Sequence, residues 1–239
     1  MTDALTILLS LLVLAGGGPR SGTRPTDVAV PDIVAHGRPP GVRACASCHL
    51  PNGFGRPETA SLAGQPAAYI EEQMAEYRRG ARSSLNPTER GATMSDIAAA
   101  VTDDEIRAAA AYFAAVPYEP WIQVVETGSI GDGIVEVPAD RGFVASVPPG
   151  SVRRGELLVT TGAGGRTVRC ALCHGEGLNG LHAVPGIAGR SPSYQLRQLR
   201  DMQRGLRQGL GPDLMKPTVA RLTDADMIAI VAYTASVRP

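Results

Sequence analysis

The sequence predicts an all-α protein built from two tandem copies of one helical domain, and three observations support this. The pentapeptide Cys-x-x-Cys-His begins at Cys45 and occurs again from Cys170. An offset of 125 residues relates the first parts of the two halves and takes Gly64 to Gly189. An offset of 121 relates their last parts, where each half ends in apolar residues at helical spacing. A repeat of about a hundred residues lies within the usual range for a domain.

The chain begins with a short, mostly apolar stretch at residues 5–15, followed by three glycines. The stretch is too short to cross a bilayer comfortably. Its composition favours the apolar part of a secretory signal peptide, although Asp3 stands where a positive charge is usual. We therefore expect residues 1–20 to be a signal peptide, with membrane association only if this segment is retained.

Each pentapeptide has the form of an attachment site for a c-type haem. Two thiols three positions apart can form thioethers to both vinyl groups of one porphyrin, and the next residue, a histidine, can ligate the iron. The residues are Cys45, Cys48 and His49 in the first half and Cys170, Cys173 and His174 in the second. A thioredoxin-like redox pair and one zinc ion held by four thiolates are the alternatives. The zinc alternative leaves the histidine after each pair unexplained.

The haem interpretation requires a further iron ligand in each half, commonly methionine or histidine. Of the six methionines, only Met94 and Met215 coincide under the offset of 121. We expect both to lie in loops and to be the axial ligands opposite His49 and His174. The other internal methionines are expected in helix cores. His182 is the alternative ligand in the second half.

Two longer helices are predicted in each half. The middle helix is expected to begin near Pro66 or Pro192, because proline suits the first turn of a helix. It should end at the glycine of the Arg-Gly dipeptide that each half contains. The last helix is expected to begin at Thr102 or Thr223, because an acidic residue follows each threonine three positions later, as in a capping box.

A linker at 118–150 is expected to separate a first domain at 21–117 from a second domain at 151–239. The linker contains three short runs of β-favouring residues, divided by glycine and aspartate, which could form a small hairpin. A strap over the domain interface, a docking element for a redox partner and a disordered connection are the three alternatives for its role.

The series of motifs resembles the two-domain dihaem class I cytochromes c of the cytochrome c4-like kind. In each half Cys-x-x-Cys-His is followed by Leu-Ala-Gly or Ile-Ala-Gly, a tyrosine, a glutamine, Arg-Gly-x-Arg, the methionine and a last helix. The resemblance implies two covalently attached haem c groups, each in a class I cytochrome c fold with His/Met iron. It also implies haem attachment outside the cytoplasmic membrane, and therefore a periplasmic protein.

One position departs from that family. The family commonly has a proline whose carbonyl accepts a hydrogen bond from the outer nitrogen of the axial histidine. Pro185 stands there in the second half, but Ala60 stands there in the first. A backbone carbonyl can still accept the bond, so the orientation of the histidine can survive.

Iron with both axial positions filled has no open site for a substrate, which indicates an electron-transfer protein rather than an enzyme. The expected function is transfer of single electrons between respiratory partners such as a quinol-oxidising complex and a terminal oxidase. The alternative is the cytochrome c subunit of a periplasmic dehydrogenase complex. A dihaem enzyme, such as a peroxidase or a thiosulfate oxidoreductase, is a third hypothesis, and it requires a labile or missing iron ligand.

Composition limits the other function classes. The chain has 23 basic and 23 acidic residues, so it lacks the basic excess typical of nucleic-acid binding. Arg82 and Arg207 recur in the two halves, and they are either partners of haem propionates or exposed charges at helix ends.

Aromatic residues make up only 4% of the chain, so each domain has few large side chains for its core. A porphyrin would supply the missing apolar surface, and we therefore expect the chain without haem to be largely unfolded. Replacing all four cysteines by alanine should abolish most of the helical circular dichroism. Full native helicity in that variant would contradict the prediction.

Overall fold

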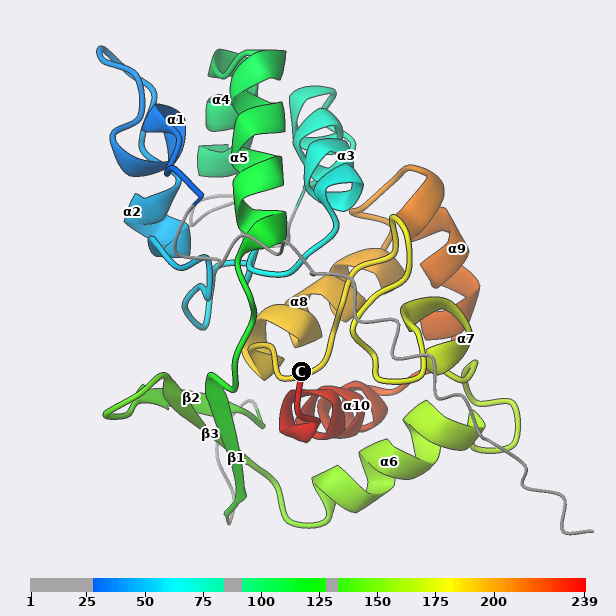
Figure 1. The fold of residues 1–239 in the computed structure, drawn as a ribbon. Helices are drawn as coiled ribbons and strands as arrows, with labels where there is room; N and C mark the ends of the chain where they lie inside the picture. The colour runs from blue at the N-terminus through cyan, green and yellow to red at the C-terminus, as the bar shows by residue number, and fades with distance from the viewer. Residues whose placement is uncertain (1–27, 84–91, 128–132) are drawn as a thin grey trace, which may run out of the picture.

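The computed structural model describes residues 28–83, 92–127 and 133–239. The expected signal peptide at 1–20 lies outside these ranges. The described chain forms two helical halves that lie against each other, with a small sheet at one side (Figure 1). The helical fold class predicted from the repeat is confirmed, and the sheet is an addition to it. Within the described ranges, none of the helices is long and apolar enough to cross a membrane.

In the described part of the first half, a pair of short helices is followed by three longer ones. These are α1 (Asp32–Ala35), α2 (Ala46–His49), α3 (Ala67–Arg78), α4 (Ala92–Ala100) and α5 (Asp103–Ala115). Helix α3 packs against both α4 and α5. The core of this half is a single cluster that includes the fully buried Val34 of α1 and Phe113 of α5.

The second half repeats this order with a longer first helix. Its elements are α6 (Ser151–Thr161), α7 (Ala171–His174), α8 (Pro192–Gln203), α9 (Leu210–Val219) and α10 (Asp224–Ser236). Helix α10 packs against α6 and α8. Gly155 allows α6 to approach α10 closely, because a Cβ atom there would lie only 1.9 Å from the carbonyl oxygen of Ala229.

The helix boundaries agree with the sequence patterns. Helix α3 follows Pro66 and α8 begins at Pro192. Thr102 and Thr223 each form a complete capping box, in which the carboxylate three residues later accepts a hydrogen bond from the threonine N–H. The two halves therefore begin their last helices in the same way.

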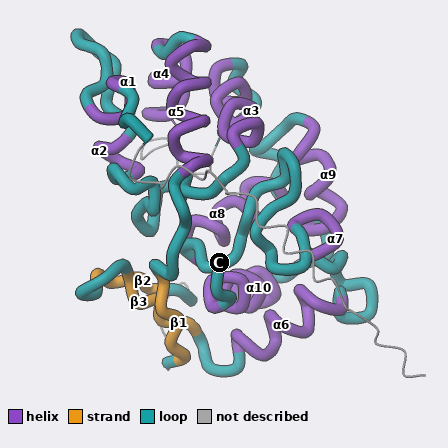
Figure 2. Tube along the Cα trace, in the orientation of Figure 1, coloured by secondary structure: helices purple, strands orange, loops and turns teal. Residues whose placement is uncertain are grey.

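The linker forms a three-stranded sheet (Figure 2). Its strands are β1 (Ile122–Glu126), β2 (Val135–Pro138) and β3 (Phe143–Val147), in the order β1-β3-β2. Strands β2 and β3 pair antiparallel, as in the hairpin expected here. Strand β1 pairs parallel to β3, which was not foreseen, because a local sequence pattern does not reveal which strand a third one will join.

The sheet contacts both halves. The Trp121 indole donates a hydrogen bond of 3.2 Å to the Gly55 carbonyl in the first half. Glu136 accepts bonds from the Ser191 hydroxyl and the Ser193 N–H in the second half, at 2.7 and 2.8 Å. These contacts favour the strap interpretation of the linker.

The two halves meet through the same positions of the repeat. Gln65 donates to the Gly186 carbonyl and accepts from the Gly186 N–H, both at 2.9 Å. Arg190, which the offset of 125 relates to Gln65, donates in return to the carbonyls of Ser61 and Ala63 at 2.9 and 3.0 Å. The interface therefore has an approximate two-fold relation between its halves.

A second pair of equivalent residues lies in the same interface. Arg82 donates to the Gln198 side chain at 2.7 Å, and Arg207 donates to the Gln73 side chain at 2.6 Å. The two arginines are only 7% and 5% exposed, so the interpretation of them as exposed helix-end charges is wrong. Their pairing with haem propionates stays a prediction. The buried Glu76 carboxylate lies 3.6 Å from Arg207 and offsets part of this positive charge.

Replacing Gln65 by alanine should destabilise the interface, because it leaves the buried N–H and carbonyl of Gly186 without partners. We expect the free energy of unfolding of the holoprotein to fall by about 2–4 kcal/mol in chemical denaturation. The matched control is Gln208→Ala, which shortens an exposed glutamine. Equal stability of the two variants would contradict the role given to Gln65.

Candidate functional site

The two Cys-x-x-Cys-His motifs form short helices in equivalent places. Cys45 and Cys170 are the N-caps of α2 and α7, and His49 and His174 are the last residues of those helices. The His49 N–H donates to the Cys45 carbonyl at 3.0 Å, and the His174 N–H to the Cys170 carbonyl at 2.9 Å. One helical turn therefore brings the paired thiols onto one side, since residues three apart are neighbours on a helix.

Each motif histidine is buried and held by one backbone carbonyl. Nδ1 of His49 lies 2.8 Å from the Ala60 oxygen, and Nδ1 of His174 lies 2.7 Å from the Pro185 oxygen. A carbonyl can only accept, so Nδ1 carries the proton and Nε2 is left with a free lone pair. Burial lowers the pKa of both imidazoles, which favours the neutral form that binds a metal.

The exchange of proline for alanine in the first half therefore leaves this contact unchanged. The acceptor is a main-chain oxygen, and it is within hydrogen-bond distance of Nδ1 in both halves. The loop that carries it is also the same in both. Gly55 donates to the His49 carbonyl and Gly180 to the His174 carbonyl, at 3.1 and 2.8 Å.

The four cysteines form two separate pairs, one in the turn of α2 and the other in the turn of α7. Helices α2 and α7 lie on opposite sides of the molecule in Figure 1, so one zinc ion cannot be held by all four sulfurs. Burial raises the pKa of Cys45 and of Cys170 to about 11. A redox-active or zinc-binding cysteine is stabilised as a thiolate instead. A half-buried and neutral first thiol in each pair, beside a metal-binding imidazole, fits covalent attachment of a haem.

The two methionines expected as axial ligands lie in helices, which corrects their predicted place in loops. Met94 lies in α4 and Met215 in α9, and both are half-buried. Helix α4 ends in three alanines, the strongest helix formers, which explains its extension over a segment read as a loop. Met215 packs against the same apolar cluster as Cys170. Met202 and Met227 lie in the core, as predicted.

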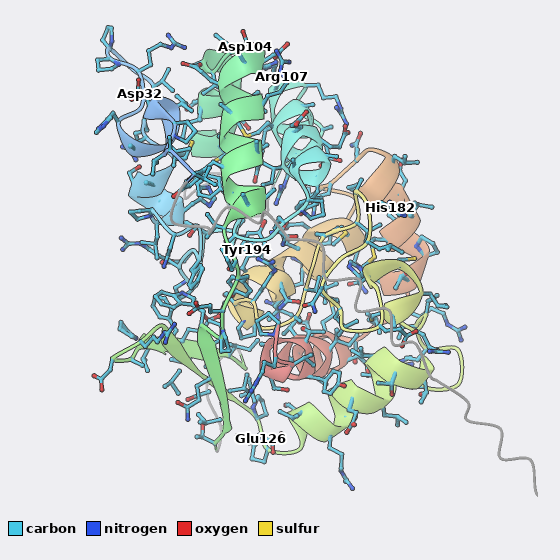
Figure 3. The ribbon with its side chains drawn as sticks, in the orientation of Figure 1. Asp32, Asp104, Arg107, Glu126, His182 and Tyr194 are labelled. Carbon is cyan, nitrogen blue, oxygen red and sulfur yellow. The ribbon has the colours of Figure 1, made fainter. Side chains whose placement is uncertain are left out.

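The alternative histidine ligand has a different environment. His182 lies in an exposed turn with a positive φ of 54°. Figure 3 shows it on the same side of the molecule as α9. Its exposure contrasts with the burial of His174 and favours Met215 as the second ligand of that half.

Comparison with known proteins agrees with this geometry. The family model described as Cytochrome c matches residues 42–116. A "Thiosulfate dehydrogenase electron acceptor" of Stutzerimonas stutzeri is 31% identical over 205 residues, which cover 84% of this chain and 82% of that protein. Cytochrome c4 of Pseudomonas aeruginosa is 26% identical over 195 residues, covering 79% and 81% of the two chains.

The chain belongs to the dihaem cytochrome c4-like family. It is an electron-transfer protein, and it carries two covalent haem c groups, one at each cysteine pair. Cytochrome c4 of Acidithiobacillus ferrooxidans has the same fold, with a TM-score of 0.62 and 26% identity over 80% of this chain and 98% of that one.

A larger solved protein also contains this fold. The thiosulfate dehydrogenase (TsdBA) of Marichromatium purpuratum superposes with a TM-score of 0.67 and 29% identity over 87% of this chain. The match spans only 39% of that longer chain. The dihaem unit of this family is therefore found both as a separate protein and as part of a larger polypeptide.

Sequence reasoning missed the residues that join the two halves. Gln65 and Arg190 differ in chemistry, so neither looked like a repeated motif. Two features of the sequence could have indicated a contact here. The offset of 125 relates Gln65 to Arg190, and each is a polar residue directly after the Ala-Gly dipeptide of its half.

The ligand assignment can be checked one methionine at a time. Met94→Ala and Met215→Ala should each remove one sulfur-to-iron charge-transfer band from the spectrum of the oxidised protein, because each removes one thioether ligand. Met74→Ala is the control, since Met74 packs against the core of the first half. A full spectrum in either ligand variant would show that the wrong methionine was chosen.

Proposed function

We propose that this protein accepts electrons from a thiosulfate dehydrogenase and passes them, one at a time, to a later respiratory acceptor. Two relatives support this: the Stutzerimonas stutzeri protein and a second "Thiosulfate dehydrogenase electron acceptor" of Thiomonas intermedia, 27% identical over 83% of this chain and 80% of that one. The fold's presence within the Marichromatium purpuratum thiosulfate dehydrogenase supports it further. These findings favour the dehydrogenase-complex alternative over a carrier that feeds an oxidase directly.

We assign His49 and Met94 to one iron and His174 and Met215 to the other. The bond from each histidine Nδ1 to a backbone carbonyl leaves Nε2 free and supports the histidine of each pair. The methionines are supported by their coincidence under the offset of 121 and by the packing of Met215 against the same cluster as Cys170. A haem iron ligated on both faces supplies one-electron transfer and has no open position for a substrate. The protein's part is to fix the two imidazoles, keep them neutral and hold them away from water.

The contacts between the halves support transfer within one rigid unit. Gln65 and Arg190 bind the neighbouring half through main-chain groups, which cannot move without moving the backbone. The sheet adds a further connection through Trp121 and Glu136. We place the domain boundaries at 21–117 and 151–239, with the strands in the linker between them.

We further place the protein in the periplasm. The composition of residues 1–20 fits a signal peptide, and haem c is attached outside the cytoplasmic membrane in proteins of this kind. An amino-terminal sequence of the mature protein that begins upstream of residue 20 would contradict cleavage of the segment.

The proposed function predicts reduction by thiosulfate through one specific enzyme. Mixing the oxidised holoprotein with thiosulfate and the catalytic subunit of the thiosulfate dehydrogenase of the same organism should give the α-band of reduced haem c. Both haems should be reduced in turn. Thiosulfate alone and the catalytic subunit alone are the controls. An oxidised spectrum that persists in the complete mixture would overturn the proposal.

A further inference from the structure

Large apolar side chains are exposed around the haem motif of the second half. We call these residues the apolar face, and they are Val168, Leu172, Leu181, Leu210 and Leu214. Leu210 and Leu214 of α9 are the most exposed of them, at 79% and 68%. Isolated exposed leucines are common, but a group of them gathered at one site marks an interaction surface.

Three segments bring these residues together. The Thr167 hydroxyl donates to the Thr218 carbonyl at 3.0 Å, which joins the loop before Cys170 to the end of α9. The Gly180 N–H donates to the His174 carbonyl at 2.8 Å, which places Leu181 next to the end of α7. Figure 1 shows α7 and α9 on the same side of the molecule. Figure 3 shows His182, the neighbour of Leu181, on that side as well.

The first half has polar residues at every equivalent position. The offset of 125 relates Leu172 to Ser47, Val168 to Arg43 and Leu181 to Arg56. The offset of 121 relates Leu214 to Thr93 and Leu210 to Glu89.

Both halves fold around the same motif and the same last helix, so the fold itself does not require apolar residues at these positions. The difference points to a task that only the second half performs.

The charges beside the apolar face nearly cancel. Lys216 and Asp213 pair at 2.7 Å on α9, and the exposed Arg169 and Glu176 carry opposite charges on either side of α7. Such a surface attracts a charged partner weakly, because its net field is small. The partner must therefore offer an apolar, nearly neutral area, as at the core of a stable interface.

We infer that the apolar face of the second half is the docking surface for the catalytic subunit of thiosulfate dehydrogenase. This inference rests on the proposed function. In the Marichromatium purpuratum protein the same fold belongs to a longer chain, of which this chain spans 39%. That longer chain joins the same fold to the rest of a thiosulfate dehydrogenase, which supports the same kind of enzyme as the occupant of the apolar face. Each docking event passes one electron, which oxidises the thiosulfate-reduced catalytic subunit and reduces this protein.

The experiment replaces two leucines by the residues of the first half. The holoprotein variant Leu172→Ser/Leu214→Thr should react with the thiosulfate-reduced catalytic subunit at least about tenfold more slowly than wild type, as a second-order rate constant in stopped flow. The rate for the wild type should change little with ionic strength, because the contact is apolar. The matched control is Arg43→Ser/Arg56→Ser in the first half, which should stay within about twofold of wild type.

Two further measurements keep the outcomes separate. The sulfur-to-iron charge-transfer band must be intact in each variant. If the double variant does not take up haem, Leu181→Arg replaces it, because Leu181 lies outside the Cys-x-x-Cys-His motif and outside α9. A double variant that reacts within about twofold of wild type, or a tenfold loss in the first-half control instead, overturns the inference and leaves the proposed function standing. A wild-type protein that is not reduced at all overturns both.

Discussion

One hydrogen bond, from the outer nitrogen of each buried histidine to a backbone carbonyl, connects the parts of this molecule. The acceptor in the first half is Ala60, and the residues directly after it contact the other half. The carbonyls of Ser61 and Ala63 accept from Arg190, and Gln65 binds Gly186. A single loop therefore orients the iron ligand and forms the contact between domains. A change at the interface would move the carbonyl and with it the imidazole, so the environment of each iron depends on the packing of the two halves.

The interface is polar, and the terminal guanidinium nitrogens of its buried arginines are matched by acceptors, whereas Nε of Arg190 and of Arg207 makes no hydrogen bond. Burial lowers the pKa of Arg190 to about 10, so the guanidinium keeps its charge at neutral pH. It lies 4.3 Å above the ring of Tyr118, whose hydroxyl donates to the Gly189 carbonyl. Arrangements of this kind contribute modestly while complete, but the loss of one partner leaves a buried charge or a buried carbonyl unpaired. The polar interface therefore fixes the orientation of the two halves more strictly than an apolar interface of equal size would.

The sequence was informative where a residue acts within its own half. Cys-x-x-Cys-His, the capping boxes at Thr102 and Thr223, and the carbonyl expected at Ala60 all depend on neighbours close in the chain, and the structure has them as predicted. The sequence was less informative where a residue or strand pairs with a part of the chain that is distant in sequence. Arg82 gave no indication that it would cross to Gln198, and β1 none that it would join β3. Met94 lies in a helix rather than the expected loop, because the three alanines that end α4 favour the helical conformation of the whole segment.

The reciprocal use of Gln65 and Arg190 has a consequence for the history of the chain. Two copies that meet through one and the same patch form a closed pair, the geometry of a symmetric homodimer, and leave no complementary surface for a third copy. An ancestral single-domain protein could have associated in this way before its gene was duplicated and fused. Fusion then raised the effective concentration of one copy around the other. After fusion the two halves no longer had to share one sequence. Their outer surfaces could then diverge while the interface between them was kept.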